Sequence, residues 1–320
     1  MSLLHYPNAV CLSLCLIFVL PLYVMVPKEV KNLEYNDSVQ IKYRMYAVSA
    51  ATIFAVLLCW TLYYDLDLVL GAPKFQVMIG LNENLLSGMI TSLFLMMIFY
   101  FGPIVLYLTL NFIKLSHRIS VKGQLSRLPY PMPVWEFVTN IYLDVTYQIR
   151  SFDIEKFRAI VFAPVAEEIV FRACMVPPYY IYYKYILKDY SPYYIIFVAP
   201  SWFGVAHIHH LITKLKSGEK WMVAVAQTLF QFLYTIIFGC LASMLFLRTG
   251  SILSPIVSHM FCNYMGLPSN DYLVRGKSKV SCVYPYRYLF LGLDMLGLCL
   301  FVYAVIPFTE SFQDHNIYWE

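Results

Sequence analysis

The stretch of sequence that decides the fold is WMVAVAQTLFQFLYTIIFGCLASMLFL, at residues 221–247. It holds 27 residues without a charged side chain, and about 20 apolar residues in a helix are enough to cross the roughly 30 Å hydrocarbon core of a bilayer. The rest of the chain is similar, because 60% of its 320 residues are hydrophobic and 13% are charged, about half the charged share of a soluble domain. The mean hydropathy of +0.63 therefore indicates a membrane protein. A net charge of only +4 does not favour a nucleic-acid-binding surface.

Working outward from this stretch, seven other segments are apolar over lengths close to that of a membrane span. We predict an all-α, polytopic integral membrane protein with about eight transmembrane helices that enclose a polar cavity. No internal repeat is evident, so the prediction is a single membrane-embedded domain over residues 1–320. In chain order, the eight segments are approximately 9–27, 45–64, 88–112, 156–176, 193–211, 221–247, 252–267 and 288–307.

The loops between these segments differ in their basic residues. The first, third, fifth and seventh loops hold 16 Lys and Arg, whereas the even loops hold 4. Because cytosolic loops carry the excess of Lys and Arg, we place the odd loops in the cytosol and both termini on the opposite side. The eight tyrosines of residues 177–194 then indicate an aromatic belt on the non-cytosolic face. Residues 134–149 have the apolar spacing of an amphipathic helix on the cytosolic membrane surface.

The fourth segment contains three ionisable side chains within six residues, Glu167, Glu168 and Arg172. Each charge near the centre of a bilayer costs roughly 2.5–3.5 kcal/mol, so the group requires an explanation. On a helix Glu168 and Arg172 are four residues apart and can pair. Glu167 is turned about 100° away and cannot share that pairing equally. It is a carboxylate in an apolar setting, which is typical of a general base, although a purely structural ion network fits these residues equally well.

Two other segments also contain polar side chains. His207 lies within the fifth segment, while His209 and His210 border a basic loop and are expected to be solvated. In the seventh segment His259 and Asn263 are four residues apart and share a helical face.

A carboxylate and an imidazole can deprotonate a water, while a second imidazole and a carboxamide can donate hydrogen bonds to an oxyanion. Together these are the groups that peptide hydrolysis requires.

Three short motifs follow in order on separate segments: Glu167-Glu168-x-x-x-Arg172, Phe203-x-x-x-His207 and His259-x-x-x-Asn263. In this order they resemble the motifs of the type II CAAX prenyl endopeptidase family, and residues 155–267 carry the resemblance. It implies that Glu167 and His207 activate the hydrolytic water and that His259 and Asn263 form the oxyanion hole. Glu168 and Arg172 would be supporting residues.

The resemblance also implies the substrate and the compartment. The expected activity is an endopeptidase of the endoplasmic reticulum membrane that removes the last three residues from Cys-a-a-X proteins such as Ras-type small GTPases. These substrates already carry a farnesyl or geranylgeranyl chain, which partitions into the lipid bilayer. The active site would open to the cytosol, and no cofactor or metal ion is expected.

Two alternatives stay open at this point. One is a metalloprotease that binds zinc through Glu167, Glu168, His207 and His259, since carboxylates and imidazoles are acceptable zinc ligands. The other is a non-catalytic transporter or membrane scaffold with a buried polar network.

Overall fold

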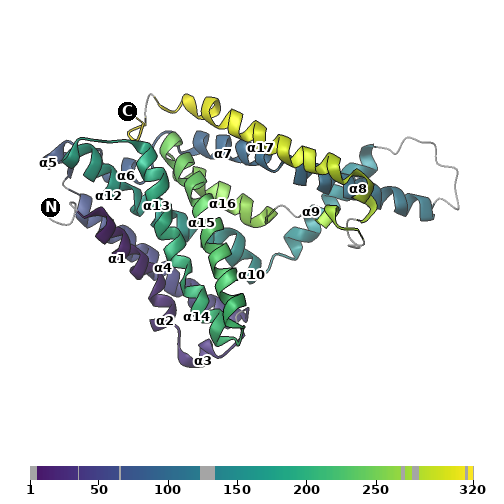
Figure 1. Cartoon of the computed structure of the whole chain (residues 1–320), viewed down its shortest axis with the longest axis horizontal. Helices are drawn as coiled ribbons and strands as arrows, with labels where there is room; N and C mark the ends of the chain where they lie inside the picture. The colour runs from purple at the N-terminus through teal and green to yellow at the C-terminus, as the bar shows by residue number, and fades with distance from the viewer. Residues whose placement is uncertain are drawn as a thin grey trace. The chain divides into compact units, whose positions relative to one another are not determined.

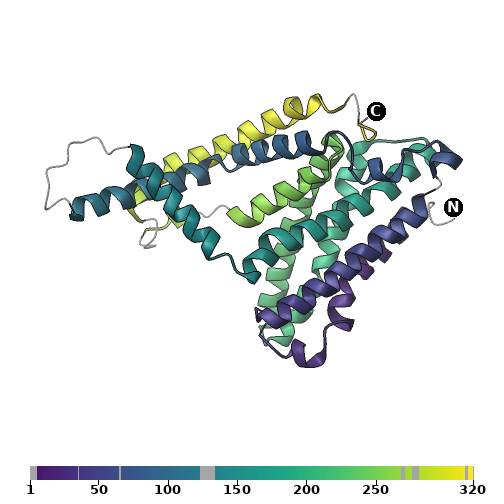
Figure 2. The same cartoon turned by 180° about the vertical axis from the view of Figure 1, so that it is seen from behind.

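The computed structural model describes residues 6–34, 36–64, 66–122, 134–267, 271–275, 281–313 and 316–319, and these contain helices and no β-strand. The predicted all-α fold class is therefore confirmed (Figures 1 and 2). The first helices are α1 Pro7–Val19, α2 Pro21–Val24, α3 Lys28–Lys31, α4 Ser38–Tyr63, α5 Leu66–Leu70, α6 Phe75–Met78, α7 Leu85–Phe99, α8 Phe101–Lys122, α9 Val134–Arg150 and α10 Ile154–Phe157. They are followed by η3 Arg158–Phe162, α11 Ala163–Glu168, η4 Ile169–Cys174, α12 Val176–Ile181, η5 Tyr182–Leu187, α13 Pro192–His207, α14 His209–Lys216, α15 Trp221–Thr249, α16 Leu253–Met265, η6 Asp271–Leu273, η7 Ser281–Tyr286 and α17 Arg287–Glu310.

The chain divides into two compact units. The first unit combines residues 1–93, 154–264 and 307–320, and the second combines residues 94–153 and 265–306. All six predicted site residues belong to the first unit. The grouping of the whole chain as a single domain stays a prediction.

The helices long and apolar enough to cross a membrane match most of the predicted segments. Among the described residues there are five, namely Pro7–Val24, Ser38–Tyr63, Pro192–Lys216, Trp221–Thr249 and Cys282–Glu310. The pair α7 and α8, bent by 68°, makes a sixth if it is counted as one span. The two remaining segments, 156–176 and 252–267, are helical but fall outside this group because they contain the ionisable residues or are short. The chain is a multi-pass membrane protein, and the count of eight spans is not confirmed.

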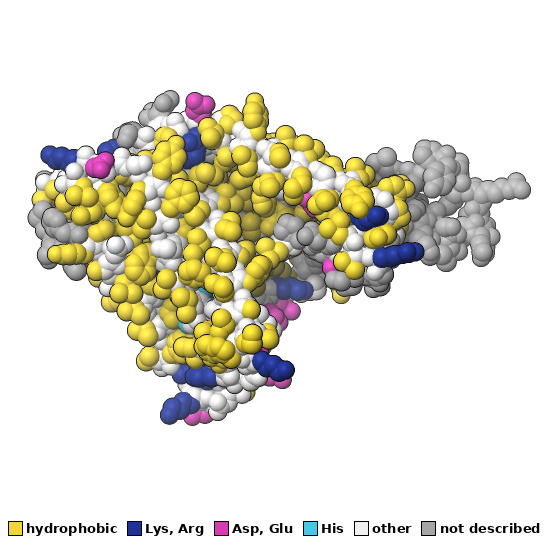
Figure 3. All heavy atoms as spheres, in the orientation of Figure 1, with side chains coloured by type: hydrophobic (Ala, Val, Ile, Leu, Met, Phe, Trp, Pro, Cys, Tyr) yellow, Lys and Arg dark blue, Asp and Glu magenta, His cyan; other side chains and the backbone are white. Residues whose placement is uncertain are grey.

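The first unit separates the loops into two ends. In Figure 1, α2, α3 and the turn from α14 to α15 lie at one end, while both termini and α5 lie at the other. The first and fifth loops therefore share one end, as the distribution of Lys and Arg predicted. Figure 3 shows charged side chains gathered towards these two ends, with an almost wholly hydrophobic face between them over α1, α13 and α15. Exposed apolar side chains such as Phe197, Phe230 and Ile237 suit a surface in contact with lipid.

Helices α13 and α15 form the tightest helix pair of the first unit. Gly204 of α13 faces Ile236 and Phe232 of α15, and a Cβ atom on Gly204 would lie 2.9 Å from Ile236 Cγ1. On the opposite helix, a Cβ atom on Gly239 would lie 2.7 Å from Pro200 Cβ. Small residues allow the backbones of membrane helices to approach closely. This pair positions His207, which ends α13.

Two of the eight tyrosines in the tyrosine-rich segment differ from their predicted role. The segment begins with helices α12 and η5, and Tyr179 and Tyr180 are 0% and 1% exposed. The Tyr179 hydroxyl donates to Asn8 Oδ1 at 2.7 Å and accepts from Trp202 Nε1 at 2.7 Å. These two tyrosines are part of the core because α12 packs between α1 and α13, so composition alone was misleading for them.

The predicted amphipathic helix forms as α9, within the second unit. Its apolar side chains Trp135, Tyr142 and Ile149 are 76%, 66% and 69% exposed. Its position on the cytosolic membrane surface stays a prediction.

The close contact between α13 and α15 predicts a size limit at Gly239. Replacement of Gly239 with Val should lower the free energy of unfolding by about 1–3 kcal/mol, since the added carbons overlap Pro200. Thermal unfolding of the purified protein in detergent measures the change. The matched control is Gly292→Val in α17, where no atom lies within 4 Å of the added Cβ. Equal melting temperatures for the two variants would contradict the proposed packing limit.

Candidate active site

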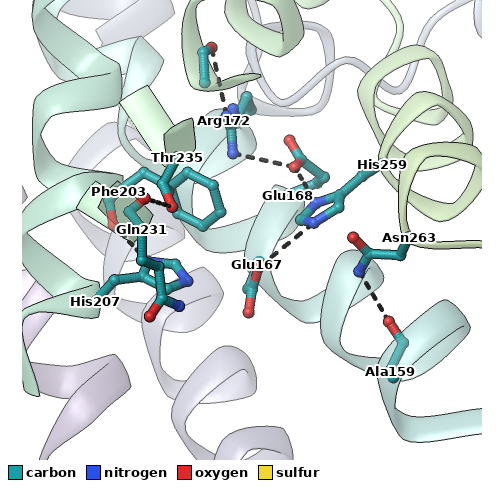
Figure 4. A network of polar contacts seen from close by, with 11 residues as sticks. Ala159, Glu167, Glu168, Arg172, Phe203, His207, Gln231, Thr235, His259 and Asn263 are labelled. Atoms are coloured by element: carbon teal, nitrogen blue, oxygen red, sulfur yellow. Dashed lines mark hydrogen bonds and ion pairs between the residues drawn. The ribbon is translucent and has the colours of Figure 1, made fainter. Parts of the chain in front are cut away.

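The site is built around a buried ion pair. Glu168 ends α11 and Arg172 lies one turn later in η4, with Arg172 Nη1 3.0 Å from Glu168 Oε1. Their side chains are 0% and 1% exposed. The predicted pairing at a spacing of four residues is therefore confirmed (Figure 4).

Three further helices surround this pair. His259 of α16 donates from Nδ1 to Glu168 Oε1 at 2.7 Å. Arg172 Nη2 donates to the Gly239 carbonyl of α15 at 3.4 Å, and its guanidinium lies 4.7 Å from the centre of the Phe203 ring of α13. A carboxylate oxygen, a backbone carbonyl and an aromatic face thus stabilise the buried cation. The contacts hold four parts of the chain together at one point.

Glu167 has different surroundings from its neighbour. Its Oε2 atom lies 3.8 Å from His259 Nε2, and 19% of its side chain is exposed. It lines a cavity of about 400 Å³. Of the two adjacent glutamates, one is therefore enclosed by donors and the other faces open space, as the 100° turn between them predicted.

His207 lines the same cavity from the end of α13. Its Nδ1 lies 2.7 Å from the Phe203 carbonyl oxygen. Because a carbonyl only accepts hydrogen bonds, Nδ1 carries a hydrogen, and in the neutral imidazole Nε2 is then an acceptor. Gln231 of α15 also lines the cavity, and Figure 4 shows it beside His207. Gln231 was not predicted as a site residue, because the sequence of an apolar helix does not indicate which way a single amide side chain points.

His259 and Asn263 share a face of α16 but contact different partners. Asn263 lines the cavity, and its Nδ2 donates to the Ala159 carbonyl at 2.8 Å. Ala159 belongs to the π-helical turn η3. An amide NH₂ has two hydrogens, so the group can bond to Ala159 and still donate into the cavity. His259 reaches Glu167 from the buried side, where 8% of its side chain is exposed.

Four ionisable residues of the cavity wall lie outside the predicted site. His209 and His210, expected to be solvated, are half-buried and line the cavity, and the rings of His207 and His210 are 5.6 Å apart. The chain breaks after His207 and resumes as α14 at His209, which turns these rings inward. Arg44 and Arg158 complete the set. The place of these two arginines in the cavity wall depends on how α4 packs against η3, and no local sequence pattern predicts that packing.

The zinc alternative requires a different arrangement of the same side chains. In the described part of the chain, no three or more His, Cys, Asp and Glu side chains are grouped so as to hold a metal ion. Glu168 Oε1 is already engaged by Arg172 and His259. The arrangement suits acid–base chemistry, because a carboxylate, an imidazole acceptor and an amide donor face one cavity.

Comparison with known proteins shows that the part of the chain holding the site is similar to a known family. Residues 154–265 match the family described as "Type II CAAX prenyl endopeptidase Rce1-like". This range contains all six predicted site residues and all three motifs.

Three relatives extend the match. A human protein named "CAAX prenyl protease 2" is 28% identical over 302 residues, which cover 94% of this chain and 80% of the relative. An Arabidopsis thaliana protein of the same name is 28% identical over 309 residues, 94% of this chain and 89% of the relative. A Schizosaccharomyces pombe protein, "Probable CAAX prenyl protease 2", is 42% identical over 113 residues, which cover 35% of this chain and 40% of the relative. No solved structure gives a significant match. Taken with the three ordered motifs, these similarities relate the chain to the type II CAAX prenyl endopeptidases.

Proposed function

We propose that this protein is a membrane-embedded endopeptidase that removes the last three residues from prenylated Cys-a-a-X proteins such as Ras-type small GTPases. The observation that carries the proposal is that Glu167 and His207, on separate helices, line one cavity. The relatives named as CAAX prenyl proteases over nearly the whole chain support the substrate class. The lipid chain of the substrate would lie in the bilayer while its peptide reaches the cavity.

Water is the proposed nucleophile. Glu167 accepts a proton from the water as the water oxygen attacks the carbonyl carbon of the prenylated cysteine. His207 supports this step through Nε2, which accepts a hydrogen bond because Nδ1 donates to Phe203. When the peptide bond breaks, the proton passes to the leaving amine. No metal ion or cofactor is needed in this scheme.

Asn263 and His259 are the proposed oxyanion donors. Asn263 lines the cavity and carries a second amide hydrogen. His259 has its Nε2 beside Glu167, and its Nδ1 donates to Glu168. For His259 to donate from Nε2 as well, both of its ring nitrogens must carry hydrogen in the proposed step. Glu168 and Arg172 are positioning residues because they act through His259 and the helix packing.

The proposed location is the endoplasmic reticulum membrane, with the cavity open to the cytosol. Arg44 and Arg158 line the cavity, and they adjoin the first and third loops, which the basic residues assign to the cytosol. A cavity opening on this side would meet substrates made in the cytosol.

The general base assignment predicts a loss of turnover in Glu167→Gln. Turnover should fall by about 10²-fold or more while the protein stays folded, since general base catalysis contributes about 10²–10⁴. The measurement is mass analysis of farnesylated and unfarnesylated Cys-a-a-X peptides incubated with purified protein. Loss of three residues from the farnesylated peptide alone is expected.

Glu155→Gln is the matched control, because Glu155 lies in α10 of the same helical run and does not line the cavity. Activity of Glu167→Gln within a few-fold of the parent would refute the base assignment. Activity that prolonged chelation abolishes and zinc restores would favour the metalloprotease. A parent protein inert towards both peptides would favour the scaffold.

The buried ion pair predicts coupled effects on stability. Glu168→Gln should lower the free energy of unfolding by about 3–5 kcal/mol, because it leaves the Arg172 charge buried without its counter-charge. The double variant Glu168→Gln with Arg172→Met should lose less free energy of unfolding than the sum of the losses in the two single variants. A double-mutant cycle in thermal unfolding measures this difference. Additive losses would mean that the pair does not act as a unit.

The proposed orientation predicts the pattern of glycosylation. Asn36 begins the only Asn-x-Ser/Thr sequon in the chain, Asn36-Asp37-Ser38, and it should carry no glycan because the first loop faces the cytosol.

A flexible insert with its own sequon tests both sides of the membrane independently of loop length. Placed between Lys188 and Asp189 it should be glycosylated, and placed after Gly218 it should not. Gel mobility before and after endoglycosidase gives the readout. The reverse pattern would overturn the orientation.

A further inference from the structure

Two arginines line the candidate active-site cavity without a role in the proposed hydrolysis. Arg44 comes from α4, and Arg158 is the first residue of η3. Among the described residues that line this cavity, Glu167 is the only carboxylate. The wall therefore carries two permanent positive charges, because an arginine side chain stays protonated in proteins. Such a wall is complementary to an anion.

The substrate brings one anion into this cavity. A Cys-a-a-X sequence ends in an α-carboxylate three residues beyond the bond to be cleaved. We propose that Arg44 and Arg158 bind this carboxylate and so position the scissile bond at Glu167. The inference rests on the proposed endopeptidase function and adds to it the means by which the end of the chain is recognised. Arginine suits the task because its planar guanidinium forms paired, charge-assisted hydrogen bonds with a carboxylate.

The spacing along the chain supports this arrangement. Arg158 precedes Glu167 by nine residues in one continuous helical run, η3 followed by α11. At about 1.5 Å per residue, the two positions are separated by about 13 Å or less along the helix axis. Three extended residues span about 10 Å. A peptide with its scissile carbonyl beside Glu167 therefore places its terminal carboxylate within reach of the Arg158 side chain.

The residues between these two points suit the intervening peptide. Ala159, Phe162 and Ala163 line the cavity between Arg158 and Glu167, and the facing wall is also largely apolar, with Phe18, Val19, Leu22, Met45 and Val48. The two "a" residues of the substrate are aliphatic, so their side chains would lie against this surface.

The position of Arg158 is constrained by the first loop. Its Nη2 donates to Asn36 Oδ1 at 3.5 Å, which links η3 to the residues just before α4. Arg44 is on α4 itself. The two guanidinium groups are thereby held on adjoining parts of the structure, and α4 contacts η3 directly. Preorganised donors of this kind bind an anion at a lower entropic cost than side chains on separate flexible loops.

The first test changes only the substrate. A farnesylated Cys-a-a-X peptide is compared with its C-terminal amide and with a peptide extended by one residue, using the unmodified protein. We expect kcat/KM for the amide to be about 10- to 100-fold lower, the usual effect of losing a hydrogen-bonded charge. The value of kcat/KM for the extended peptide should be lower by a similar factor, because its carboxylate lies about 3.5 Å beyond the position that the arginines can bind.

The second test changes the arginines. Arg158→Gln and Arg44→Gln should each lower kcat/KM for the free acid by about 10-fold or more and leave cleavage of the amide unchanged. Lys156→Gln and Lys42→Gln are the matched controls, because each removes a positive charge two residues from one of the arginines, at an exposed position outside the cavity wall. Both controls should keep the preference for the free acid.

The outcomes separate the two proposals. Equal cleavage of acid and amide by the unmodified protein would overturn carboxylate recognition and leave the endopeptidase function standing. Equal loss of acid and amide cleavage in the arginine variants would assign these residues another role, such as binding a lipid phosphate. That result would also overturn carboxylate recognition. A folded variant that kept the full acid preference would overturn the assignment of that arginine. No cleavage of any farnesylated peptide would instead refute the proposed function.

Discussion

The first unit depends on the pairing of buried charges. Glu168 and Arg172 are almost fully enclosed at a separation of 3.0 Å, and the desolvation of an isolated charge costs several kcal/mol. The pair offsets this cost only if further donors and acceptors complete it. His259, Gly239 and the ring of Phe203 supply three such contacts. Helices α13, α15 and α16 must therefore meet α11 and η4 at this point, and the geometry of the site follows from the requirement.

This constraint gives two adjacent glutamates opposite environments. Glu168 is held by donors on two sides, so it stabilises the structure and orients His259. Glu167, one residue earlier, is directed into the cavity with part of its side chain exposed. The contacts that fix Glu168 thus also place Glu167, the proposed general base, because both lie on the same turn of helix. In the proposed mechanism, structural and chemical roles are divided between neighbours.

The helical run of the site is not uniformly α-helical. Segments η3 and η4 are π-helices on either side of α11, and wide turns of this kind occur often at functional sites. In η3, Ala159 offers its carbonyl to Asn263 of α16. This bond attaches the end of α16 to the wall that also holds Arg158. The same local irregularity thus connects the proposed oxyanion donor with the proposed carboxylate-binding residues.

The sequence by itself determined the helical membrane fold, the family motifs and the Glu168–Arg172 pair. These depend on hydropathy over about 20 residues or on spacing within one helix, so they are local properties. Only the tertiary structure decided that His259 contacts both glutamates and that Gln231, His209, His210, Arg44 and Arg158 line the cavity. It likewise buried Tyr179 and Tyr180, which composition had assigned to a membrane interface. The physical reason is that a side chain's partners on other helices depend on helix rotation and crossing, which the buried charges and the close packing at Gly204 and Gly239 fix together.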